Sequence, residues 1–135
     1  MKYLITRTND AFPSNELELE NNLWYNLWER RSAPFIPINI DDQIIIRARD
    51  HSFFKANFKT LIKHEFKCRD NIMNILMIHG YIAYLDDPYW IEKLNIESGF
   101  LLAYKFKNIT KLTDEPNMSN SIVLGTGWTK LNNPN

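Results

Sequence analysis

The chain has 135 residues, 44% of them hydrophobic and 13% aromatic, so it is long enough to bury a core and too apolar to be disordered. Sixteen basic and sixteen acidic residues cancel, so any surface for nucleic acid must come from local segregation of charge. The single cysteine, Cys68, cannot form an internal disulfide, and no stretch approaches the ~20 apolar residues of a membrane span. We therefore expect one domain over residues 1–135, a cytoplasmic location and no membrane partner.

The first half of the chain predicts two helices and two strands. Alternating apolar residues predict a strand over 3–8. A capping residue, Ser14, and apolar residues at helical spacing predict a helix over 15–31, which the prolines from Pro34 onward end. Isoleucines at 44–46 predict a strand over 43–49. Phenylalanines and lysines that recur at helical spacing predict a second amphipathic helix over 52–66.

The second half predicts mainly strands, over 72–78, 81–85, 100–112 and 121–124, with a helical turn over 89–94. In the longest, Phe100, Leu102, Tyr104 and Phe106 alternate with residues that end in Lys105 and Lys107, which is typical of a half-buried strand with a basic end. The strands cluster instead of alternating with helices. The fold class is therefore α+β, with a mixed, partly closed, barrel-like sheet and two main flanking helices.

No complete catalytic or metal-binding set is visible, so we expect neither a cofactor nor a bound metal. The histidines lack ligand spacing, and His64 with Cys68 would supply only two ligands. Cys68 with a histidine could form a nucleophilic dyad, but an ordinary thiol beside solvated lysines is the simpler interpretation. The acidic pairs at 41–42 and 86–87 fit turns better than acid–base catalysis, and the Gly-Thr-Gly at 125–127 lacks the third glycine of a dinucleotide loop.

A basic stretch from Gln43 to Arg69 is the most informative feature for function. Its only acids are Asp50 and Glu65. Clustered lysine and arginine favour phosphate binding, and a solvated helix face is the alternative. Tryptophans at loop positions, Trp90 and Trp128, could stack on a base or simply pack. The basic residues are Arg47, Arg49, Lys55, Lys59, Lys63, Lys67 and Arg69.

The N-terminal half resembles the EVE domains of the PUA-like superfamily. The first strand, Tyr3-Leu4-Ile5-Thr6-Arg7-Thr8-Asn9, is similar to the family's opening Tyr-Trp-Ile-x-x-Thr-Asn, with Leu4 in place of Trp. The segment 40–45 is similar to its Gly-Asp-x-Ile entry, with Asp41 in place of Gly, and 99–104 is similar to its return strand. The resemblance implies a pseudo-barrel that reads a flipped or single-stranded modified base, with Thr8 and Asn9 on the base edge and Trp28 stacking.

These observations favour a nucleic-acid-binding module, for DNA or RNA, over an enzyme. The predicted contacts are Thr8, Asn9, Trp28, Arg47, Arg49, Lys55, Lys59 and Lys63. Two alternatives stay open: a small nucleoside or nucleotide hydrolase that uses Asp41, Asp42 or a histidine, and a protein-interaction or inhibitor protein that uses exposed aromatics.

Overall fold

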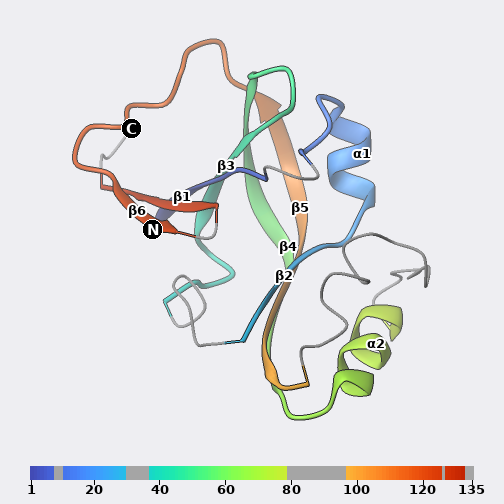
Figure 1. Ribbon diagram of the computed structural model, residues 1–135. Helices are drawn as coiled ribbons and strands as arrows, with labels where there is room; N and C mark the ends of the chain where they lie inside the picture. Colours follow the sequence, from blue (N-terminus) through green and yellow to red (C-terminus); the bar gives the residue numbers. More distant parts are fainter. Residues whose placement is uncertain (8–10, 30–36, 79–96, 126, 133–135) are drawn as a thin grey trace.

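A computed structural model shows a protein made mostly of β-strands, which form one curled, mixed sheet that resembles half of a barrel (Figure 1). The structure describes residues 1–7, 11–29, 37–78, 97–125 and 127–132. The strands are β1 (Lys2–Ile5), β2 (Trp24–Trp28), β3 (Gln43–Arg47), β4 (Phe53–Phe66), β5 (Gly99–Lys111), β6 (Ile122–Gly125) and β7 (Trp128–Leu131). Their order across the sheet is β2-β5-β4-β3-β1-β7-β6. Only the β1–β3 pair is parallel, and each other neighbouring pair is antiparallel.

The predicted mixed, partly closed sheet is confirmed, and the predicted pair of main flanking helices is wrong. Two helices are described: α1 (Glu16–Asn21), which is short, and α2 (Arg69–Ile78). The predicted strands at 3–8, 43–49, 100–112 and 121–124 correspond to β1, β3, β5 and β6. The expected strand at 81–85 and helical turn at 89–94 lie outside the described residues.

The segment predicted as a helix over 52–66 is the longest strand of the sheet. Phe54, Ala56 and Phe58 are buried in alternation with solvent-facing neighbours, and β4 pairs with β3 on one side and β5 on the other. A repeat of four residues is also a multiple of two, so lysines four apart fit one face of a strand as well as a helix face. Pairing on both sides of β4 decides between the two because it supplies hydrogen bonds along the strand.

Only the beginning of the segment predicted as a helix over 15–31 is helical, and the rest contains strand β2. Asn15 caps α1 by accepting hydrogen bonds from the backbone N–H groups of Leu17 and Glu18, and the helix ends at Asn21. After it, Leu23, Tyr25 and Leu27 pack into one cluster, while Trp24 and Trp28 pack into another. This period of two belongs to a strand, and aromatic residues favour strands.

The strand predicted over 72–78 is part of helix α2. Ile72 is buried and Ile75 half-buried in the same cluster, at the i, i+3 spacing of one helix face. An aliphatic run of this length is ambiguous between strand and helix. Packing on the sheet beside Phe66 settles the segment as a helix.

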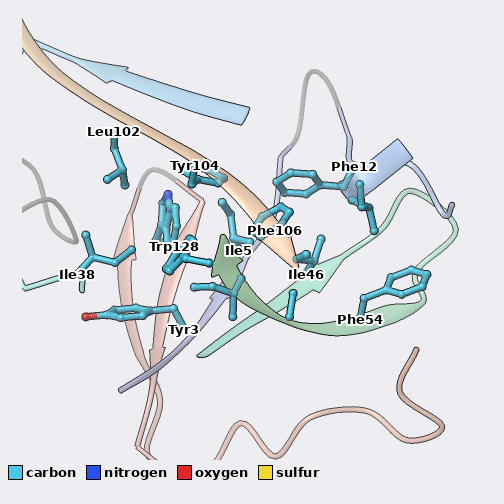
Figure 2. Packing of buried hydrophobic residues seen from close by; sticks show 14 of the residues in the cluster. Tyr3, Ile5, Phe12, Ile38, Ile46, Phe54, Leu102, Tyr104, Phe106 and Trp128 are labelled. Carbon is cyan, nitrogen blue, oxygen red and sulfur yellow. The ribbon is translucent and has the colours of Figure 1, made fainter. Parts of the chain in front are cut away.

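The sheet has a core face and an outer face. The core face carries an aromatic cluster in which Trp128 meets Tyr3 and Tyr104 edge-on, at centroid distances of 6.1 and 5.6 Å (Figure 2). Helix α1 lies on this face, where Leu19 is fully buried. Helix α2 packs against the outer face at the end of the sheet near Phe66 (Figure 1).

Two glycines sit where a side chain would meet backbone. A Cβ at Gly99 would collide with the carbonyl oxygen of Trp28 on the neighbouring strand. Gly127 has a φ of +87° in the turn before β7, and its carbonyl accepts a hydrogen bond from the N–H of Thr6. The close approach of β2 to β5 and that of Gly127 to the backbone of Thr6 both depend on these positions.

Candidate nucleic-acid interface

Positive charge is concentrated in the strands. Glu65 is the one acidic residue within the described strands. It pairs with Phe100, which in turn pairs with the core-face residue Trp28, so Glu65 lies on the core face. Of the other acids in the described part of the chain, Glu16, Glu18 and Glu20 lie in α1, Asp70 lies in α2, and the rest lie in turns and loops. Neutral overall composition therefore conceals a basic sheet. The basic residues of the strands are Lys2, Arg47, Lys55, Lys59, Lys63, Lys105, Lys107, Lys111 and Lys130.

The strand register shows which basic side chains share the outer face. Lys105 and Lys107 flank the buried Phe106 in β5, so they point away from the core. Lys55 lies opposite Ile45 and Arg47 opposite Phe53, and both partners belong to a small outer-face cluster. Lys2 precedes the buried Tyr3 and shares this face. We call Lys2, Arg47, Lys55, Lys105 and Lys107 the basic outer face.

Lys55, Lys59 and Lys63, which the sequence predicts as one stripe on a helix, are divided between two faces by an irregularity in β4. The register with β5 shifts between Phe58 and Thr60, where Lys59 lies exposed. Before the shift, Lys55 is on the outer face. After it, Lys63 lies opposite Leu102, on the core face. A bulge of this kind exchanges the faces of all later residues, so the stripe is not one continuous binding surface.

The remaining predicted contacts lie in separate places. Arg47 donates a hydrogen bond from Nη2 to Nδ1 of His51, at 2.9 Å. Arg49 is exposed in the turn after β3, where its backbone N–H bonds to the carbonyl of Phe12. Trp28 is 9% exposed and packs in the core-face cluster. Thr8 and Asn9 lie outside the described residues.

A fixed amide on the core face has no counterpart among the sequence predictions. Oδ1 of Asn26 accepts hydrogen bonds from the hydroxyl of Tyr104, at 2.9 Å, and from Nε1 of Trp128, at 3.3 Å. Two donors on one oxygen set the orientation of the amide and point its NH₂ group away from them. The three residues come from β2, β5 and β7, so no local pattern in the sequence reveals the contact.

Asp42 is a buried carboxylate directly before β3. It is 6% exposed, and its carboxylate accepts hydrogen bonds from the backbone N–H of Asn39, at 2.8 Å, and from the amino group of Met1, at 2.9 Å. Burial lowers the pKa of the Lys63 ammonium, and the negative charge of Asp42 opposes that shift. The hydrogen bonds give Asp42 a structural role, as expected for a turn aspartate.

Ionisation of Tyr3 makes the free energy of unfolding depend on pH at high pH, which can be tested. Burial raises the pKa of its hydroxyl above the ordinary value of 10.0, and the charge of Asp42 raises it further. The folded state therefore favours the neutral phenol: the contribution is complete below the unfolded pKa and is lost as pH rises through the folded pKa. As the pH rises from the pKa of Tyr3 in the unfolded state through its pKa in the folded state, the free energy of unfolding should decrease less in Tyr3→Phe than in the parent protein. Urea denaturation at a series of pH values measures this, and equal slopes for both proteins would contradict it.

The residues of the two alternative functions are placed as follows. Asp41 is exposed in the turn before β3, where its N–H bonds to Oδ1 of Asn39. Within the described residues, no three of His, Cys, Asp or Glu are grouped to hold a metal ion, and Cys68 is exposed. No described helix has the length and apolar character needed to cross a membrane. For protein interaction, the exposed apolar residues include Ile122 and Val123 on edge strand β6, at 50% and 78% exposure.

Comparison of the chain with protein-family models, curated proteins and solved structures found no match. The resemblance to EVE domains therefore stays a prediction.

Proposed function

We propose that the protein is a nucleic-acid-binding module and that the basic outer face is its contact surface. The observation that carries the proposal is the segregation of charge: lysine and arginine line the outer face, while the only acid of the described strands, Glu65, is on the core face. Lysines on such a face neutralise phosphates and release condensed counterions, which supplies most of the sequence-independent affinity for nucleic acid.

The exposure of these side chains supports the proposal. Arg47, Lys55 and Lys107 are exposed, and Lys2 and Lys105 are half-buried, so each can lay its aliphatic stem along the sheet while its charge reaches solvent. The sheet supports them from below, because the core-face residues between them, such as Ile44, Ala56 and Phe106, are fully buried. A rigid base of this kind lowers the entropy cost of binding.

The resemblance to EVE domains supports the same class of function and adds a modified base as the ligand. In this proposal the chain is a PUA-like module, with Thr8 and Asn9 near the base and the basic outer face on the surrounding backbone. Labelled oligonucleotides with and without a methylated base test the addition directly. Equal affinity for both would remove the modified base and leave phosphate binding intact.

The triple substitution Lys55→Ala, Lys105→Ala and Lys107→Ala tests the surface. We expect it to weaken binding to a labelled duplex by about tenfold or more at low salt, because each removed lysine no longer displaces counterions from the phosphates. The slope of log affinity against log salt should become shallower by about 0.9 for each phosphate that is no longer neutralised. Fluorescence anisotropy at a series of salt concentrations gives both quantities.

The matched control is Lys67→Ala, Lys111→Ala and Lys130→Ala, which removes the same charge but none of the basic outer face; Lys67 is exposed in the bend after β4. Lys111 lies opposite the buried Phe54 and Lys130 opposite the buried Tyr3, so neither belongs to the outer face. An equal reduction of affinity in the control would show that net charge matters and the surface does not. No salt-sensitive binding of the parent protein at micromolar concentration would overturn the proposal.

A further inference from the structure

Four polar residues form a single row across the outer face of the sheet. The register places Lys107 of β5 opposite Asn57 of β4, Asn57 opposite Gln43 of β3, and Gln43 opposite Lys2 of β1. Directly paired residues present their side chains on the same face. The row therefore reads basic, amide, amide, basic, and we call it the amide row.

The burial pattern confirms the face on which the row lies. The chain neighbours Tyr3, Ile44, Ala56, Phe58 and Phe106 are all buried in the core-face cluster. Because successive side chains of a strand alternate, the four residues of the row point outward. Lys107 is exposed, and the other three are half-buried.

The dimensions of the row suit the groove of a duplex. Three inter-strand steps of about 4.8 Å separate Lys107 from Lys2, which gives about 14 Å between their Cα atoms. The major groove of B-form DNA is about 12 Å wide and admits a two-stranded β-ribbon, so the two central strands, β3 and β4, can face the groove while the flanking strands lie over its edges. Lysines at the two ends can therefore reach the phosphates on either side, while the amides of Asn57 and Gln43 lie over the groove between them.

The chemistry of the row favours reading of base edges over stacking. Asparagine and glutamine amides can bond to N6 and N7 of adenine as a bidentate pair, whereas phosphate contacts carry no sequence information. Among the described residues around the basic outer face, Phe53 is the one aromatic residue. It is half-buried and packs against Leu4 and Ile45. Binding of single strands without sequence preference relies on exposed aromatic platforms. Duplex RNA has a major groove too narrow for such side chains.

We infer that Gln43 and Asn57 make the interface selective for the base sequence of duplex DNA, with a preference for adenine. This inference rests on the proposed function, since it requires that the outer face binds nucleic acid. It adds a division of labour: the lysines supply affinity, and the two amides supply discrimination.

Selection from a library of random duplexes tests the inference. The parent protein should enrich sites that contain adenine at fixed positions. The double variant Gln43→Ala and Asn57→Ala should lose about tenfold or more of its preference for the enriched duplex over a scrambled one, because each bidentate pair contributes about that much discrimination. Its affinity for the scrambled duplex should change by less than about twofold, because the phosphate contacts remain.

Two further variants keep the test sharp. Thr110→Ala with Thr129→Ala, which also lie on the outer face but outside the row, should leave the preference unchanged. Asn57→Asp keeps the size of the side chain and replaces a donor–acceptor pair with acceptors only. It should move the preference toward cytosine, whose N4 group donates in the major groove.

The possible outcomes distinguish failure of this inference from failure of the proposed function. Salt-sensitive binding without any enriched sequence would overturn the inference and leave the proposed function standing. The inference also fails if the double variant keeps the parent's preference, or if single strands bind more tightly than duplexes. Absence of binding to every nucleic acid would overturn both.

Discussion

Replacing Trp128 with alanine is expected to lower the free energy of unfolding by about 3–5 kcal/mol, the usual cost of removing a large buried aromatic side chain. Trp128 is 1% exposed and packs edge-on against Tyr3 and Tyr104 (Figure 2). Its indole N–H also donates to Asn26. The substitution would therefore leave a cavity among side chains that come from β1, β2 and β5.

Urea denaturation followed by far-ultraviolet circular dichroism measures this decrease without depending on tryptophan fluorescence. Trp128→Phe should lie between alanine and the parent protein, because it keeps most of the ring and removes the hydrogen bond. Val123→Ala, at a position 78% exposed, is the control and should change stability by less than about 0.5 kcal/mol. A decrease below about 1 kcal/mol for Trp128→Ala would contradict close packing around the indole.

Replacing Asn26 with leucine is expected to cost about 2–4 kcal/mol, although the two side chains have a similar shape. The reason is that the hydroxyl of Tyr104 and the indole N–H of Trp128 both lose their hydrogen bond to Asn26, and removing the partner of a buried donor costs about 1–3 kcal/mol. Thermal and urea unfolding measure the decrease in stability.

A double-mutant cycle distinguishes the missing hydrogen bonds from poor packing. Tyr104→Phe alone should destabilise the parent protein by about 1 kcal/mol, because it removes one hydrogen bond. In the Asn26→Leu background the same change should cost less than in the parent protein, since the hydrogen bond to Asn26 is already missing. Costs that simply add would show that the two side chains do not interact.

Local patterns in the sequence predict a strand well when its period is unambiguous. Alternation of large apolar residues from Phe100 to Phe106 predicts β5 over nearly its full length. Lysines four residues apart suit both a helix and a strand, so the same kind of reasoning wrongly predicts a helix for β4. The hydrogen bonds that β4 makes with two neighbouring strands decide the outcome, and they depend on residues far away in the chain.

In the candidate site, too, local sequence patterns predict some features, and long-range strand pairing decides the others. The sequence indicates the basic stretch that contains Arg47 and Lys55, which is the region that we propose for phosphate binding. It cannot show that Lys63 points to the core face, because an irregularity near Lys59 exchanges the faces of the strand. Nor can it show the amide row, whose residues 2, 43, 57 and 107 meet only through the register of four strands.

Separation of the charges also gives the described part of this neutral chain an electric dipole. The strands carry the positive end, and helix α1, with three exposed glutamates, contributes to the negative end. A dipole in the field of a polyanion experiences a torque that acts within about one Debye length, ~8 Å at physiological salt, before any side chain touches. If the proposed function holds, the protein would approach a phosphate backbone already turned with its basic outer face forward, and this orientation, instead of attraction by net charge, would raise the fraction of productive encounters.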